Sequence, residues 1–376
     1  MSGHLGTGLE VGSPGRVLVV GSGLIGTSIG LALQGQADVV LADLDDDVLS
    51  QAVRRGAGRP WDGSAKVDHA VVAVPPRAVA VTLRTLERRD VAVTWSHVAS
   101  TQAVVQVEVE TSGVDVARLC GSHPMAGRER PGPSAASADL FAGRPWALCP
   151  SAATGEQAFR RTRRIAELCG ADPVVLSAAE HDVAVALVSH LPQVTASALA
   201  AVVLAEGGGR SGAVRLAGPG LQDTTRIAAS DPGLWGDVLR QNAAAVAPLV
   251  RGLAAELLRV ADGLDRLRAP GGQPDPSALS VVDDLLRRGN DGRKLIPVKH
   301  GEHDRDFAVV PVGVSDRPGQ IAGVLVAAAE AGVNVEDVRV EHLAGRPRGV
   351  VGLLVQTAEQ EHARAALRAA GWDVLA

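Results

Sequence analysis

The chain has 376 residues, more than one ordinary hydrophobic core contains, so we expect two or three domains. Hydrophobic residues make up 46% and charged residues 21%, as in ordinary globular proteins, and the net charge is −5. This charge argues against nucleic acid as a partner, because phosphate binding requires a concentrated basic surface. The only lysines are Lys66, Lys294 and Lys299, which leaves little room for lysine-dependent chemistry.

The N-terminus and the cysteines bear on the compartment. Residues 1–15 are rich in glycine and have no basic start followed by an apolar stretch, so we interpret them as a disordered tail. The apolar stretch 194–205 is too short for a membrane span. Cys120, Cys149 and Cys169 form no close pair, so we expect buried thiols, without disulfides or a metal. We therefore expect a cytoplasmic protein with no membrane partner.

Residues 16–178 alternate between strands and helices. Short apolar strands are expected at 16–20, 37–42, 68–74 and 91–95. Strands that alternate with helices at this spacing predict a parallel sheet covered on both faces, as in a Rossmann-type α/β domain.

A glycine-rich turn follows the first strand and opens a helix. Gly21 permits the tight turn, Gly23 lets the backbone approach a pyrophosphate, and Gly26 allows the helix to pack closely on the strand. The start of the helix supplies free N–H groups and the positive end of its dipole. The turn therefore predicts dinucleotide binding by Gly21, Gly23, Leu24, Ile25 and Gly26.

Three further residues are expected to complete the cofactor site. Asp43 stands at the end of the second strand, where a carboxylate binds the ribose hydroxyls and repels the additional phosphate of NADP. We therefore expect NAD, although Asp43 could instead be a turn residue or a helix N-cap. Val74 and Pro75 end another strand, and we expect them beside the nicotinamide ribose, with a purely structural role as the alternative.

The catalytic candidates follow the ends of expected strands. A hydride-transfer enzyme that acts on a hydroxyl needs a base near that hydroxyl and cations for any carboxylates. His123 lies in a glycine- and proline-framed loop, residues 121–129, and Ser100 lies in residues 96–102. In open α/β sheets, ligands bind outside the carboxyl ends of the strands.

Residues 179–290 are expected to form an all-helical domain. The stretches 179–206 and 234–267 are rich in alanine and leucine and carry no strand signal. Such apolar helices need a partner surface, and the core of a homodimer would provide it. Arg226 could grip a carboxylate with two hydrogen bonds, or pair structurally with Asp223, and Trp235 could line a pocket or the core.

The C-terminal part reads as linkers and a small domain. A proline- and glycine-rich linker at 269–276 precedes a short helix at 277–288 and a polar linker that begins at 289 and fills 291–306. Residues 307–376 predict a ferredoxin-like α+β domain. Its strands are expected at 308–314, 335–341, 350–356 and 372–375, and its helices at 319–331 and 359–370.

Taken together, the segments from about residue 16 to 242 resemble the prephenate/arogenate dehydrogenase (TyrA-type) family. The likeness rests on the glycine turn, Gly-Ser-His-Pro-Met-Ala-Gly at 121–127, Ser-His-Leu-Pro at 189–192, and Asp-Thr-Thr-Arg-Ile-Ala at 223–228. Residues 316–321 and 331–335 resemble an ACT domain, which implies an amino-acid effector.

The resemblance implies NAD-dependent oxidative decarboxylation of prephenate to 4-hydroxyphenylpyruvate, a step of tyrosine biosynthesis. It assigns the hydroxyl proton to His123, the orientation of His123 and the hydroxyl to Ser100, and a substrate carboxylate to Arg226. Gln193 and Trp235 are the remaining substrate-side candidates. Because Gln193 is neutral, it offers no partner for the ammonium of arogenate, so we favour prephenate.

The chain also departs from the family. The usual Asp-x-Gly-Ser-x-Lys reads His-Val-Ala-Ser-Thr-Gln at 97–102, and Pro219 replaces a common glycine. These changes leave open arogenate dehydrogenase activity or a non-catalytic regulator that senses NAD or amino acids. A β-hydroxyacid dehydrogenase is disfavoured, since no lysine lies between Lys66 and Lys294. We recognise no chorismate mutase segment and expect a monofunctional enzyme.

Overall fold

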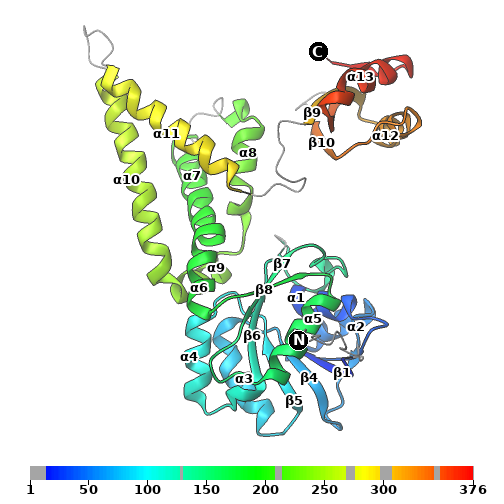
Figure 1. The fold of residues 1–376 in the computed structure, drawn as a ribbon, viewed down its shortest axis with the longest axis vertical. Coiled ribbons are helices and arrows are strands. Elements are labelled where there is room, and N and C mark those ends of the chain that lie inside the picture. The colour runs from blue at the N-terminus through cyan, green and yellow to red at the C-terminus, as the bar shows by residue number, and fades with distance from the viewer. Residues whose placement is uncertain are drawn as a thin grey trace, which may run out of the picture. The chain divides into compact units, whose positions relative to one another are not determined.

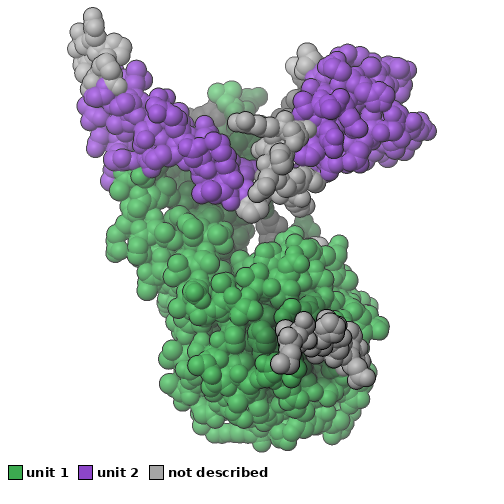
Figure 2. All heavy atoms as spheres, viewed as in Figure 1, with its two compact units in different colours: residues 1–257 green, residues 258–376 purple. Residues whose placement is uncertain are grey.

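The computed structural model describes residues 14–127, 130–207, 214–267, 276–296, 307–342 and 348–375. Residues 1–257 and 258–376 form two compact units, coloured separately in Figure 2. Most of the expected tail at 1–15 and most of the two expected linkers lie outside the described residues, at 1–13, 268–275 and 297–306.

The first unit contains an eight-stranded sheet (Figure 1) in the order β3-β2-β1-β4-β5-β6-β7-β8. Its first four strands are β1 (Arg16–Val20), β2 (Asp38–Ala42), β3 (Arg59–Pro60) and β4 (Val67–Val72). The other four are β5 (Ala92–His97), β6 (Leu119–Pro124), β7 (Pro145–Cys149) and β8 (Asp172–Val175). The pairings are parallel except that between β6 and β7, so the prediction of a parallel sheet is wrong at this one pair. The described part of the connection from β6 to β7 holds no α-helix to carry the chain back for a parallel crossover.

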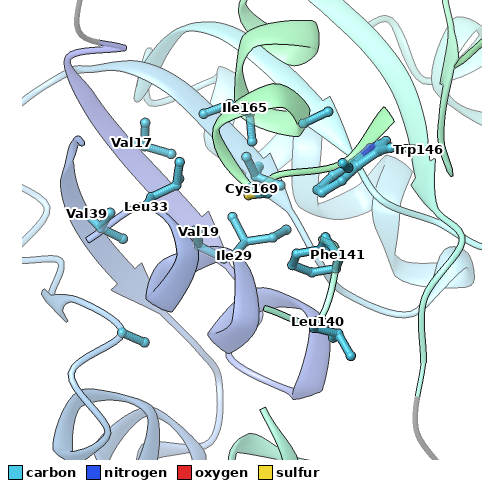
Figure 3. Packing of buried hydrophobic residues seen from close by; sticks show 14 of the residues in the cluster. Val17, Val19, Ile29, Leu33, Val39, Leu140, Phe141, Trp146, Ile165 and Cys169 are labelled. Carbon is cyan, nitrogen blue, oxygen red and sulfur yellow. The ribbon is translucent and has the colours of Figure 1, made fainter. Parts of the chain in front are cut away.

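Helices cover both faces of this sheet, as the alternation of strands and helices predicts. The core on one face comprises α1 (Leu24–Ala32), α2 (Asp46–Arg54) and α5 (Glu156–Leu168), and Figure 3 shows its packing around Ile29 and Phe141. The core on the other face comprises α3 (Val79–Glu87) and α4 (Ala103–Ser112). Neighbouring strand residues enter opposite cores: Val17 and Val19 the first, Leu18 the second. Fully buried strands of this kind are apolar on both faces.

The helical region of the first unit starts at a capping box. Ser177 Oγ accepts a hydrogen bond from Glu180 N at 3.2 Å, and Glu180 Oε2 accepts one from Ser177 N at 2.8 Å, which fixes the start of α6 (Ala178–Val185). A π-helical turn, η4 (Ala186–His190), joins α6 to α7 (Leu191–Gly207). After them come α8 (Pro219–Thr225), η6 (Arg226–Ala229), α9 (Pro232–Gln241) and α10 (Ala243–Leu267), and the last ten residues of α10 belong to the second unit. The expected helical stretch 234–267 is therefore broken at Asn242.

The helical stretch Ala178–Gly207 is longer than the expected apolar helix at 194–205. By length and composition alone it could cross a membrane, with a mean hydropathy of 1.6 and 17% of that window buried. However, His181, Asp182 and His190 are buried along it and hydrogen-bonded to residues outside it. These contacts favour a helix of a folded domain over a membrane span.

The second unit contains α11 (Pro276–Lys294) and a four-stranded antiparallel sheet. The order along the chain is β9 (Phe307–Ser315), α12 (Gln320–Glu330), β10 (Asp337–His342), β11 (Arg348–Gln356), α13 (Gln360–Ala369) and β12 (Asp373–Val374). The sheet order β10-β11-β9-β12 is that of a ferredoxin-like fold, as predicted.

Helix α11 runs to Lys294, although a linker was expected from residue 289. Ion pairs one helical turn apart explain the difference: Arg287 binds Asp283 at 2.6 Å, Arg288 binds Asp284 at 2.8 Å, and Lys294 binds Asp291 at 2.7 Å. Ion pairs at this spacing stabilise an exposed helix slightly, which offsets part of the cost of its glycines.

Candidate active site

The glycine turn has the geometry that a dinucleotide requires. Gly21 has φ +97°, and a Cβ there would lie 2.5 Å from the carbonyl oxygen of Ala73. A Cβ at Gly26 would lie 1.9 Å from the carbonyl oxygen of Gly21, whereas in the described part of the chain nothing lies within 4 Å of one at Gly23. Gly21 and Gly26 are therefore needed for packing, and Gly23 leaves room for a pyrophosphate at the start of α1.

Two side groups frame this turn. Asp43 accepts hydrogen bonds from the backbone N–H groups of Ser22 at 2.6 Å and Asp45 at 2.9 Å. The carboxylate therefore lies beside the turn, where ribose hydroxyls would reach it, and it also holds the turn in place. Val74 Cγ1 lies 3.2 Å from the Cβ position of Gly21, so the residues that follow β4 border the same turn. Leu24 and Ile25 direct their side chains into the core and leave their backbone for the ligand.

The expected catalytic residues follow adjacent strands of the sheet. Gly21, Val74 and Ser100 come after β1, β4 and β5, and His123 is the penultimate residue of β6. These four strands are neighbours in the order β1-β4-β5-β6 and run parallel. Their carboxyl ends therefore share one edge of the sheet, the edge at which such folds bind ligands. His123 belongs to a strand, not to the loop that the sequence suggested.

His123 is half-buried and contacts the helical region. Its Nδ1 lies 3.0 Å from Nε2 of His181, and the two rings meet edge to face at 5.1 Å between centroids. Burial, together with the neighbouring His181 and His190, lowers the pKa of His123 to about 3. The imidazole is therefore neutral near pH 7 and able to accept a proton.

His181 continues the network to Asp182. His181 Nδ1 lies 2.8 Å from Asp182 Oδ1, which also accepts the backbone N–H of Gln102 at 2.8 Å, while Oδ2 accepts that of Ala103 at 2.9 Å. Burial raises the pKa of Asp182, but these hydrogen bonds outweigh it and the net shift is downward. Asn242 Nδ2 donates to the backbone oxygen of Asp182 at 2.7 Å and lies 3.1 Å from Nδ1 of His190.

The altered segment 97–102 has a clear structural role. Gln102, which stands where the family has a lysine, donates from Nε2 to the carbonyl oxygens of Ala99 at 2.7 Å and Ser122 at 2.9 Å. It ties this loop to β6 beside His123. Ser100 is half-buried, and in the described part of the chain it makes no hydrogen bond to His123. Burial, with His181 nearby, lowers the pKa of His97 to about 4, so His97 is also neutral near pH 7.

The substrate-side candidates lie on the helices. Gln193 is buried on α7, where Nε2 contacts Ser197 Oγ at 3.3 Å and Oε1 accepts from Ser230 Oγ at 3.5 Å. Trp235 packs edge to face on His190 at 5.8 Å between centroids. Arg226 is exposed on η6, which packs against α7.

The network joins segments that are distant in the sequence. His181 and Asp182 carry a visible sequence signal, an adjacent His–Asp pair, but Asp182 reads more readily as a structural residue. Nothing in the sequence marks Asn242 as part of the site, because its contacts depend on its place between α9 and α10 in the fold. The sequence therefore identifies His123 but not the groups that hold it. The individual site assignments stay predictions.

Comparisons with known proteins agree with this architecture. A sequence model of the prephenate dehydrogenase nucleotide-binding domain matches residues 29–175, and one of the prephenate dehydrogenase dimerization domain matches residues 177–270. "Probable prephenate dehydrogenase NovF" of Streptomyces niveus is 37% identical over 365 residues, 94% of this chain and 98% of that protein. The cyclohexadienyl dehydrogenase of Zymomonas mobilis is 31% identical over 259 residues, 65% of this chain and 87% of that protein.

Solved structures share the fold. A prephenate dehydrogenase from Aquifex aeolicus, in complex with hydroxyphenyl propionate and NAD+, has a TM-score of 0.63 at 22% identity and covers 76% of this chain and 100% of its own. The arogenate dehydrogenase of Synechocystis has a TM-score of 0.59 at 23% identity, over 75% and 100%.

The fold and the site define a dehydrogenase with a dinucleotide-binding domain and a helical second domain. The family models and the relatives make the assignment narrower. The chain belongs to the prephenate dehydrogenase family. The predictions of the family, the fold class and an oxidoreductase are thereby confirmed, while the C-terminal ferredoxin-like domain lies outside both matched regions.

Proposed function

We propose that this chain catalyses the NAD-dependent oxidative decarboxylation of prephenate to 4-hydroxyphenylpyruvate in tyrosine biosynthesis. The observation that carries the proposal is His123: a neutral, half-buried imidazole at the ligand-binding edge of the sheet, in a chain of the prephenate dehydrogenase family. The glycine turn and Asp43 fit NAD, since an open backbone and a ribose-binding carboxylate lie at the same edge.

Each side chain has a defined task in this reaction. Arg226 binds a substrate carboxylate, and His123 accepts the proton of the ring C4 hydroxyl as that carbon becomes a carbonyl. When bound, NAD supplies the acceptor for the C4 hydride, and carbon dioxide leaves the opposite ring carbon so that the product becomes aromatic. Ser100 orients the hydroxyl, and Trp235 borders the substrate through its contact with His190.

Gln193 supports prephenate over arogenate. Arogenate carries an ammonium where prephenate carries a ketone, and a buried ammonium is costly unless an anionic partner compensates its charge. Gln193 is neutral, and its carboxamide already interacts with Ser197 and Ser230. A ketone requires no charge compensation at this position.

The direct test is turnover by the purified protein with NAD and either substrate, followed at the NADH absorbance band. We expect NADH with prephenate, and a loss of about 10³-fold or more in kcat for His123→Asn, which removes the base. NADH with arogenate alone would overturn the role of Gln193. NAD binding without turnover of either substrate would refute the enzyme and favour a regulator.

The assembly and the compartment form part of the same proposal. Large apolar side chains are exposed along the helical region, among them Val183, Leu187, Val188, Val202 and Leu204. We propose that they are covered in a homodimer, in agreement with the name of the matched dimerization domain. We also propose a cytoplasmic location and, from the ferredoxin-like fold with ACT-like turns, an aromatic amino acid as effector of the C-terminal domain.

A further inference from the structure

We propose that His181 and Asp182 are positioning residues for His123. They hold its ring as the tautomer that carries a proton on Nδ1 and leaves Nε2 free to accept the proton of the substrate hydroxyl. The inference rests on the base function proposed for His123. It assigns a role to two residues of the helical region that lie 58 and 59 positions along the chain from that base.

The direction of each hydrogen bond follows from Asp182. An ionised carboxylate can only accept, so His181 Nδ1, at 2.8 Å, must carry the hydrogen and donate it. In a neutral His181, Nε2 then has no hydrogen and can only accept. His123 Nδ1, at 3.0 Å from that atom, must therefore donate. A neutral His123 that donates from Nδ1 has an unprotonated Nε2, which is the form that a base requires.

Asp182 is held firmly enough to impose this order. It is 5% exposed, and the backbone N–H groups of Gln102 and Ala103 bind one carboxylate oxygen each at the start of α4. These donors favour the charged form, as does the positive end of the helix dipole. Asn242 fixes its backbone from the start of α10. Contacts from the start of α4 and from Asn242 therefore determine where the carboxylate points.

The same pair compensates the charge that His123 gains. Of the groups that act electrostatically on its pKa, His181, His190 and His97 lower it, and Asp182 raises it. When His123 accepts a proton at Nε2, its Nδ1–H becomes more acidic. The Nδ1 proton then shifts toward Nε2 of His181. The Nδ1–H of His181 is in turn bound by Asp182. The proton count balances: the hydroxyl loses one, and the His123–His181–Asp182 chain gains one.

The test compares Asp182→Asn with His181→Gln. The asparagine carries no charge, and whichever way its carboxamide is turned, its Nδ2 faces the backbone N–H of Gln102 or that of Ala103. It therefore no longer fixes the hydrogen of His181 on Nδ1, and His123 loses its preference for the proton on Nδ1. We expect kcat to fall about 10³- to 10⁴-fold, as when the aspartate of a serine protease triad becomes asparagine. The glutamine keeps an acceptor for His123 Nδ1 but ends the path to Asp182, so we expect a smaller loss of about 10²-fold. In both variants KM for prephenate should be unchanged, since neither residue contacts substrate.

The tautomer itself is read by ¹⁵N NMR of protein labelled at histidine, with the His123 resonances assigned by His123→Asn. We expect an unprotonated Nε2 in the wild type and in His181→Gln, and a mixture of the two tautomers in Asp182→Asn. Asp172→Asn, an exposed carboxylate on β8, serves as the matched control and should change neither readout.

The outcomes separate the two proposals. A wild-type protein that does not turn over prephenate refutes the proposed function whatever the tautomer. If the wild type turns over prephenate but its His123 carries the proton on Nε2, only the positioning role of His181 and Asp182 is overturned. A normal kcat in His181→Gln does the same, and this variant decides the matter if Asp182→Asn fails to fold.

Discussion

The contacts around Gly121, two residues before His123 on β6, allow the effect of its substitution by alanine to be worked out in detail. It lies on β6 between His97 of β5 and Cys149 of β7. A Cβ at this position would meet Gln102 Oε1 at 2.6 Å, His97 Nε2 at 3.1 Å and the carbonyl oxygen of Cys149 at 3.2 Å. In Gly121→Ala the carboxamide of Gln102 must therefore move.

The cost can be worked out from these contacts. Displacing the carboxamide breaks its hydrogen bonds to Ala99 and Ser122, each worth about 1 kcal/mol net. Crowding against His97 and the backbone of β7 adds about 1 kcal/mol more. We therefore expect the free energy of unfolding to fall by about 3 kcal/mol. In a unit of this size, this change lowers Tm by about 6–12 °C. The segment that carries Ser100 is released at the same time, so kcat should fall as well.

The assay is thermal unfolding followed by tryptophan fluorescence, together with the NADH assay. Gly127→Ala is the matched control, since no atom of the described residues lies within 4 Å of its Cβ position, and it should melt as the wild type does. Gln102→Ala removes the nearest obstacle, so adding Gly121→Ala to that variant should cost only about 1 kcal/mol. Fully additive losses, or a wild-type Tm for Gly121→Ala, would show that Gln102 does not hold the segment.

Three other predictions concern the cofactor, acid stability and the helical region. Asp43→Asn should raise KM for NAD about 10-fold, because charged acceptors bind hydroxyls more strongly than neutral ones, and should narrow the preference over NADP in initial-rate assays. Burial lowers the pKa of His69 to about 3 in the folded state, so between about pH 6.5 and 3 the unfolded chain binds more protons and stability falls as the pH falls. Melting curves from pH 7 to 4 should show a weaker acid loss for His69→Gln, and an unchanged slope would contradict this. Asn242→Ala loses the hydrogen bond to Asp182 and the contact with His190, so unfolding in urea should show a loss of about 2 kcal/mol, which Asn242→Gln should not restore because its amide is one carbon further away.

Much of the fold follows from local sequence patterns. Four strands of the first sheet, β1, β2, β4 and β5, and the strands of the ferredoxin-like domain lie within a few residues of their expected positions, because short apolar runs between turns define strands without tertiary information. The glycine turn was equally clear, since its three glycines each answer a local backbone or packing need. The sequence predicts neither β7 nor its antiparallel direction, because the direction depends on the form of the preceding connection and not on the residues of the strand.

The candidate site was predicted only in part, for a physical reason. A motif identifies His123, but its hydrogen bond to His181 joins two domains of the fold and depends on how α6 docks against β6. The role of Gln102 could not be anticipated either. In the sequence it looks like the loss of a lysine, whereas in the structure its two hydrogen bonds fasten the loop beside the base.

The π-helical turn η4 determines which face of α7 each later residue occupies. His181 and His190 are nine residues apart, which in regular α-helix would place them about 180° apart around the axis, yet both are buried, at 1% and 2% exposed. The wider turn reduces that rotation, as a single inserted residue does. Deleting one residue between 186 and 190 would therefore restore a regular helix with the later residues in phase, whereas straightening the turn at the same length would rotate them by about 100°. Gln193 and the exposed apolar face would then turn together, so the residue proposed to face the substrate and the surface proposed for a second copy depend on the same turn.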